Sequence, residues 1–237
     1  MVYKFRVATR LPVYLESGDK RVFAAALDWP GWARGGRSVE EALAALVAAG
    51  PRYAAAVRKA EPSIVVPRAA SDLEVVHRLK GGSGTDFGVP GRWPDEDELP
   101  IGGAERERLA AILEGSWAAF DAAARSARGV ELRKGPRGGG RDLEKIVDHV
   151  REAEESYLVQ LGAKRSVLDR GTGDATSRRR GAVLEALALK AAGKPLPEPN
   201  AVGKPWNPRY FVRRAAWHVL DHAWEIEDRA RPEVDPD

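Results

Sequence analysis

Two histidines four residues apart, His218 and His222, are the residues of this sequence whose type and spacing most clearly suggest chemistry. The chain holds four histidines in 237 residues, so this pair concentrates half of them in one helical segment. Side chains four apart on a helix lie on the same face, one turn apart, so both imidazoles can reach one point. His149, in a second segment with helical spacing, could supply a third nitrogen. Three such ligands with open positions are typical of a catalytic rather than a structural metal site.

Three further residues of the same segment are candidates for catalysis or binding. Glu225 follows His222 by three residues, and could accept a hydrogen bond from a ligating imidazole or act as a fourth ligand. Arg213 and Arg214 could bind a substrate carboxylate through paired hydrogen bonds, and a structural salt bridge is the alternative for either of them. Mutual hydrogen bonds or water are likewise the alternative to a metal for the histidines.

Composition excludes several classes of protein. The 38 basic and 35 acidic residues nearly balance, which does not favour a nucleic-acid partner, and we expect the basic clusters Arg178–Arg180 and Lys134–Arg141 to face solvent. The sequence lacks cysteine, so disulfides, thiolate ligands and a cysteine nucleophile are excluded. It contains no apolar run of membrane-spanning length and no apolar leader segment. We therefore expect a cytoplasmic protein that does not contact a membrane.

The N-terminal residues 1–70 show the pattern of a small domain of order βββαβ. Short alternating or apolar runs predict strands at 3–7, 13–15 and 22–27, and the segment at 63–67 predicts another. Between them, Ser38 and Glu41 form a capping box that begins a helix, which Gly50-Pro51 is expected to break. Residues 71–103 are rich in glycine, proline and acidic residues, and we expect a linker or a loop draped over the next domain. His77 lies in this stretch without a histidine nearby and is expected to be a bystander.

The C-terminal residues 104–230 predict an all-α four-helix bundle, so the expected fold class is α+β. Apolar residues recur at helical spacing in four segments, at about 104–127, 142–161, 177–192 and 208–229. His149 lies early in the second predicted helix, whereas His218 and His222 lie in the second half of the fourth. The three imidazoles can therefore meet only if these two helices are antiparallel, which the sequence leaves open.

The segment from His149 to Leu158, with its acidic residues and Tyr157, resembles the second helix of the DinB superfamily of four-helix metal proteins. The segment from Trp206 to Ile226 resembles the last helix of that family, through Trp206, Arg213-Arg214, the His-x3-His pair and Ile226. The resemblance implies a divalent metal such as nickel, zinc or iron on His149, His218 and His222. It further implies a transferase that uses a low-molecular-weight thiol of the mycothiol or bacillithiol type, or a related metal-dependent hydrolase.

The N-terminal stretch is similar to the small domain of the HicB-like antitoxins. The similarity rests on the strand at 22–27, the Trp29-Pro30-Gly31 turn, Gly35-Gly36 and the helix start from Ser38 to Ala42. It implies a partner-binding or structural module. Two alternatives to the transferase therefore stand: a non-catalytic metal-binding stress or regulatory protein, and a HicB-like partner-binding module on a helical scaffold. The expected partner of the metal centre is a small-molecule substrate or thiol, and a homodimer is plausible.

Overall fold

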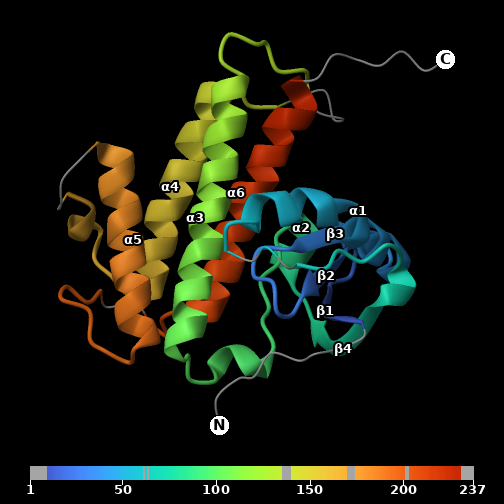
Figure 1. Ribbon diagram of the computed structural model, residues 1–237, viewed down its shortest axis with the longest axis horizontal. Helices are drawn as coiled ribbons and strands as arrows, with labels where there is room; N and C mark the ends of the chain where they lie inside the picture. The colour runs from blue at the N-terminus through green and yellow to red at the C-terminus, as the bar shows by residue number, and fades with distance from the viewer. Residues whose placement is uncertain are drawn as a thin grey trace.

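The computed structural model describes residues 10–60, 62, 64–134, 140–169, 174–200 and 203–230. It is of mixed α+β class, with a four-stranded sheet near the N-terminus followed by long helices. The helices stand side by side, and the sheet with helix α1 packs against one flank of them (Figure 1). The elements, in order, are β1 (Leu11–Ser17), β2 (Val22–Ala26), β3 (Ala33–Gly36), α1 (Val39–Val57), η1 (Ala70–Asp72), β4 (Leu73–Lys80), α2 (Ser83–Phe87), η2 (Asp95–Glu98), α3 (Gly103–Ser126), α4 (Leu143–Leu161), η3 (Arg165–Asp169), α5 (Ala175–Ala191) and α6 (Pro208–Ala230).

The sheet has the strand order β3-β2-β1-β4. Strands β1, β2 and β3 form an antiparallel meander, and β4 joins β1 in parallel with a register shift between Val13 and Tyr14. A parallel neighbour requires a crossover connection, which the chain makes through α1. The described residues thus have the order β-β-β-α-β, but its third strand, β3 at Ala33–Gly36, was not expected from the sequence.

One of the expected strands does not occupy the expected residues. The prediction of a strand at 63–67 is wrong, because residues 64–67 form no strand and the fourth strand of the sheet is β4, at Leu73–Lys80. Pro62 precedes the expected segment, Pro67 ends it, and neither can donate to a ladder, whereas Leu73–Lys80 contains no proline and pairs with β1 as an edge strand. The stretch 71–103, for which we expected a linker, thus supplies a strand of the sheet. The expected strand at 3–7 lies outside the described residues.

Helix α1 does not break at Gly50-Pro51, contrary to the expectation. The helix begins at its Ser38 N-cap, whose hydroxyl accepts a hydrogen bond from the Glu41 amide, and continues through Pro51 to Val57. Contacts on both sides of the proline stabilise it: the Trp32 indole donates to the Leu46 carbonyl, and the Tyr53 ring stacks on Trp32. Tertiary packing therefore offsets the local cost of the proline.

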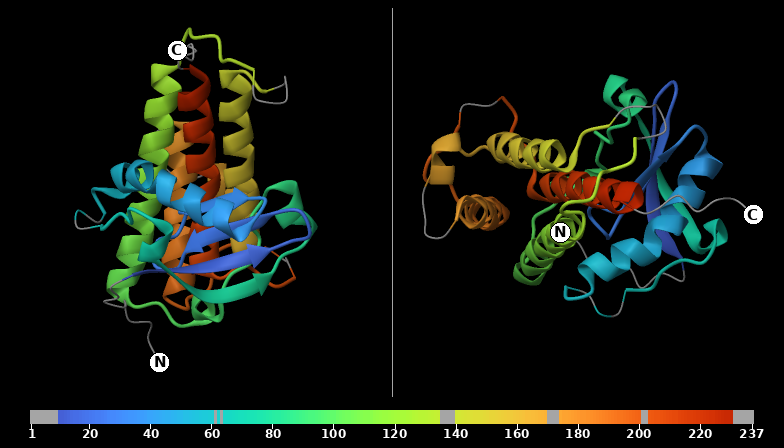
Figure 2. Two further views of the ribbon diagram at one scale, coloured as in Figure 1. Left: turned by 90° about the vertical axis from the view of Figure 1, so that its right-hand side faces the viewer. Right: turned by 90° about the horizontal axis from the view of Figure 1, so that it is seen from above.

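The relative directions of α3, α4 and α6 follow from contacts at their ends. Helix α6 is parallel to α3, because Arg209 pairs with Glu105 near the two N-termini and the Arg133 amide donates to the Arg229 carbonyl beyond the other end. Helix α6 is antiparallel to α4, since the Trp206 amide donates to the Gln160 carbonyl at 2.8 Å. Seen along their axes, α5 lies farthest from the sheet and α6 lies next to it (Figure 2).

The basic cluster Arg178–Arg180 only partly faces solvent, contrary to the expectation. Arg179 is buried and pairs with the buried Glu154 of α4, and Arg180 binds Asp121 of α3 through two hydrogen bonds. These arginines join α5 to its neighbouring helices. Within the Lys134–Arg141 cluster, residues 135–139 lie outside the described part of the chain.

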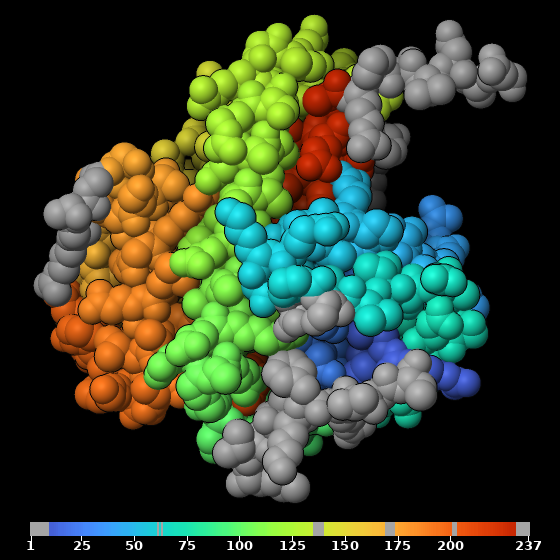
Figure 3. All heavy atoms as spheres, in the orientation of Figure 1, coloured from blue at the N-terminus to red at the C-terminus, as the bar shows by residue number. Residues whose placement is uncertain are grey.

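One hydrophobic core connects the sheet to the helices. Its buried members include Leu15, Trp32 and Leu46 from the sheet and α1, together with Phe211 and Leu220 of α6. Gly31 lets the β2–β3 turn approach α6 closely: its φ is +93°, and a Cβ there would lie 2.6 Å from the Cβ of Ala216. The sheet and helix α1 together form what we call the sheet unit. In the space-filling view the atoms of α3, α6 and the sheet unit form a continuous surface (Figure 3). No described helix is long and apolar enough to cross a membrane.

Arg213 joins α6 to the sheet by a buried set of hydrogen bonds. Its guanidinium donates to both carboxylate oxygens of Asp97, at 2.7 and 2.8 Å, and to the carbonyls of Ala26 and Leu27 at the end of β2. The Asp97 side chain has no exposed area. Breaking one partner of a buried pair leaves an uncompensated charge, which is costly.

We expect the substitution Arg213→Met to lower the free energy of unfolding by about 3–5 kcal/mol, because Asp97 would remain buried without its cation. Arg151→Met is the matched control, since Arg151 forms an exposed pair with Asp148 and should cost at most about 1 kcal/mol. Urea denaturation of the two variants measures the difference. Equal losses would show that the Arg213–Asp97 pair does not hold α6 to the sheet.

Candidate metal centre

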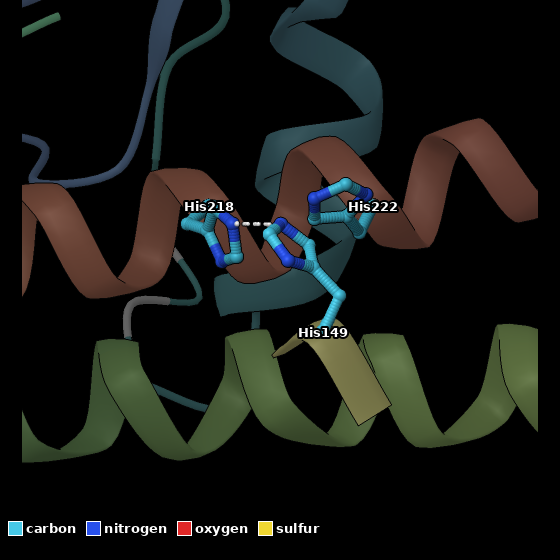
Figure 4. A group of neighbouring side chains, drawn as sticks. All are labelled: His149, His218 and His222. Atoms are coloured by element: carbon cyan, nitrogen blue, oxygen red, sulfur yellow. Dashed lines mark hydrogen bonds between the residues drawn. The ribbon is translucent and has the colours of Figure 1, made fainter. Parts of the chain in front are cut away.

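His149, His218 and His222 converge from two helices. The antiparallel contact between α4 and α6 places the start of α4 beside the second half of α6, which is the arrangement that the histidine positions require. One nitrogen from each of the three side chains lies within 4.8 Å of the others. Figure 4 shows the His149 ring reaching from α4 toward the rings of His218 and His222 on α6. The three residues predicted from sequence spacing are thus brought together.

The geometry of the imidazoles fits a shared divalent ion. The Nε2 atoms of His149 and His218 lie 3.2 Å apart, and the centroids of the three rings lie 4.6–5.0 Å from one another. Two nitrogens at about 2.1 Å from one tetrahedral ion would be separated by about 3.4 Å. The described residues form one group of this kind, which includes no cysteine or carboxylate. A set of three imidazoles suits zinc, nickel and iron alike.

Glu225 orients His222 rather than pointing at the centre. Its Oε2 lies 2.8 Å from His222 Nδ1, and its Oε1 accepts a hydrogen bond from Arg229 at 2.7 Å. Both carboxylate oxygens are therefore engaged, and the Nδ1–H of His222 donates to Glu225 while its Nε2 stays available. A carboxylate that fixes the tautomer of a ligand in this way is common at metal sites. The hydrogen bond from His222 is the main cause that lowers the pKa of Glu225.

The environment of His218 keeps its imidazole neutral. The residue is only 6 % exposed, and burial lowers its pKa to about 2, helped by the positive charges of Arg214 and Arg141. The pKa of His149 is lowered by partial burial first and then by Arg141. Neutral imidazoles have free lone pairs, so protons do not compete with a metal at neutral pH.

A series of contacting aromatic side chains extends from His218 toward the N-terminus of α6. The Tyr157 ring makes a T-shaped contact with His218 at 5.6 Å between centroids, Trp206 contacts Tyr157 at 5.4 Å, and Tyr210 contacts Trp206 at 4.9 Å. Trp93 packs on Tyr210 at 4.3 Å. The sequence analysis missed Tyr210 and Trp93. The one-turn spacing of Trp206, Tyr210 and Arg214 before His218 is the signal that could have found Tyr210.

The two candidate arginines have different surroundings. Arg213 is engaged by Asp97 and the sheet, so the structural salt bridge considered from the sequence is present for this residue. Arg214, one helical turn before His218, lies between the rings of Tyr157 and Trp217, with centroids 5.3 and 4.8 Å from its guanidinium carbon. The remaining histidine, His77, lies on β4 with its Nε2 2.8 Å from Glu96 and is not part of the centre.

Comparisons with known proteins give no further guide to this centre: no protein-family model matches the sequence, and no match was found among curated proteins or solved structures.

The lowered pKa of His218 predicts acid sensitivity of the metal-free protein. The unfolded chain protonates this histidine below about pH 6.5, whereas the folded protein keeps it neutral, so stability falls as the pH drops below that value. The loss should reach at most about 1.4 kcal/mol per pH unit for this residue. We expect unfolding curves recorded in a chelator between pH 7 and 5 to show a steeper loss for the wild type than for His218→Leu. Parallel losses would contradict the assignment.

The hydrogen bond from His222 to Glu225 should also affect metal affinity. We expect Glu225→Gln to weaken binding of zinc or nickel by about 10–100-fold, because the amide no longer supports the ligand as a carboxylate does. Glu152→Gln is the matched control, since Glu152 follows His149 by three residues but is exposed. Competition with a chromogenic chelator measures both affinities. Equal affinities for the two variants would mean that Glu225 does not support a ligand.

Proposed function

We propose that the protein is a DinB-like metalloprotein, a divalent-metal-dependent transferase that uses a low-molecular-weight thiol. The convergence of three imidazoles from α4 and α6 carries this proposal. The resemblance of the segments around His149 and His218 to the DinB superfamily supports the assignment to that class. The parallel pairing of α3 with α6 and the antiparallel pairing of α4 with α6 support a four-helix bundle that has one long crossover connection.

Three protein ligands favour a catalytic role, because structural zinc sites commonly use four. A divalent ion at this centre would act as a Lewis acid that lowers the pKa of a coordinated thiol or water. His149, His218 and His222 would hold it, and Glu225, itself held by Arg229, would fix the orientation of His222. The chain has no cysteine, so the thiol must come from a small molecule. Hydrolysis by a coordinated water is the related reaction that the same residues could support.

The N-terminal unit, which we propose to be HicB-like in origin, has a supporting role in this scheme. Its order of elements agrees with that resemblance, and the Arg213–Asp97 pair and the shared core tie it to α6. Such a buried attachment favours a fixed structural part over a separate partner-binding module.

Metal analysis of the purified, untagged protein tests the proposal. We expect about one divalent ion per chain in the wild type and none in the double variant His218→Ala/His222→Ala, since one remaining imidazole cannot hold the ion. His77→Ala is the matched control, because His77 lies outside the centre and should leave the metal content unchanged. Absence of metal in the wild type, with no uptake of added nickel, zinc or iron, would overturn the proposal.

A further inference from the structure

Arg214 differs from four other buried or half-buried arginines of α5 and α6. Its neighbours on α6, Arg209 and Arg213, each bind a carboxylate, as do Arg179 and Arg180 of α5. Arg214 has no acidic partner among the described residues, and its Nη1 is buried without a hydrogen-bond acceptor there. A guanidinium always carries its charge, so this group has an unused capacity to bind an anion.

The position of Arg214 directs that capacity toward the histidines. It precedes His218 by four residues, which places it one turn away, about 6 Å along the same face of α6. Tyr157 contacts both residues, since its ring centroid lies 5.3 Å from the guanidinium carbon of Arg214 and 5.6 Å from the ring centroid of His218. The two aromatic rings on either side restrict the guanidinium, which reduces the entropy lost when it binds a ligand.

The crevice beside Arg214 is lined by positive rather than negative groups. It runs between α6 and the sheet unit, and its charged side chains are Arg92, Arg213 and Arg214, with no carboxylate. Asp97 neutralises Arg213. The buried Glu16 carboxylate near Tyr210 is taken up by the Thr85 hydroxyl and by the backbone amides of Gly91 and Arg92. The charges that line this crevice therefore favour an anion over a cation beside the Arg214 guanidinium.

We propose that Arg214 recognises a carboxylate on the ligand of the histidine centre, so that the substrate or thiol acting there is an anion. This inference rests on the proposed metal centre. A ligand would coordinate at the histidines through one group and pair with the Arg214 guanidinium through a carboxylate about one helical turn away. A purely structural role, as a cation packed between two rings, predicts no preference among ligands.

Spectroscopic titration of the full-length, cobalt-loaded protein tests this role without requiring the native reaction. The probes are 3-mercaptopropionate and its neutral counterpart 2-mercaptoethanol, together with imidazole-4-acetate and imidazole, so that the effect of the carboxylate is separated from that of the thiol. We expect the wild type to bind the carboxylate member of each pair about tenfold more tightly, as one charge-assisted contact allows.

Arg214→Met should remove this preference and leave cobalt binding and the affinity for the neutral probes unchanged, because methionine keeps apolar packing between the rings. Arg214→Lys should retain part of the preference. Arg151→Met, which removes the same charge from the exposed face of α4, is the matched control and should retain all of it. Equal affinities for charged and neutral probes in the wild type, or a preference that persists in a cobalt-loaded Arg214→Met variant, would overturn the inference. Failure of the wild type to bind cobalt would instead overturn the metal centre, and the role of Arg214 with it.

Discussion

The antiparallel packing of α4 on α6 is the constraint on which the candidate centre depends. His149 lies in the first half of α4, and the histidine pair lies in the second half of α6, so a parallel arrangement would separate the nitrogens along the helix axes. The chain fixes the direction by joining the end of α4 to the start of α6 through the Trp206 amide and the Tyr157–Trp206 contact.

Helix α6 is stabilised from two sides, and its consecutive residues Arg213 and Arg214 contact different neighbours. Successive residues on a helix point about 100° apart, so Arg213 faces the sheet unit while Arg214 faces the side of Tyr157 and His218. The buried Asp97 and the carbonyls at the end of β2 hold the first face, and α4 packs on the second. The sheet unit thereby fixes the helix that carries two of the three histidines, and it also supplies one wall of the crevice beside Arg214.

The sequence was sufficient for the parts of the fold that depend on local periodicity. The long helices lie close to the residues expected from their apolar spacing, and the i, i+4 histidine pair correctly indicated a cluster with His149. Features decided by distant contacts were not predictable in this way. Pro51 remains inside α1 because Trp32 and Tyr53 pack on both sides of it. Residues 73–80 form a strand because they pair with β1. The roles of Arg213, Arg179 and Asp97 depend on partners 25 or more residues away, and no local pattern identifies such partners.

X-ray absorption spectroscopy at the metal edge of the nickel- or zinc-loaded wild type tests the central claim most directly, because it reports the ligands themselves. The account predicts a first shell at about 2.0–2.1 Å with the outer-shell scattering of three imidazoles, completed by light oxygen or nitrogen donors. A first shell made only of oxygen donors, or one with the scattering of a single imidazole, would show that any bound metal lies elsewhere. In that case His149, His218 and His222 would be a hydrogen-bonded cluster of the helix interface rather than a metal centre.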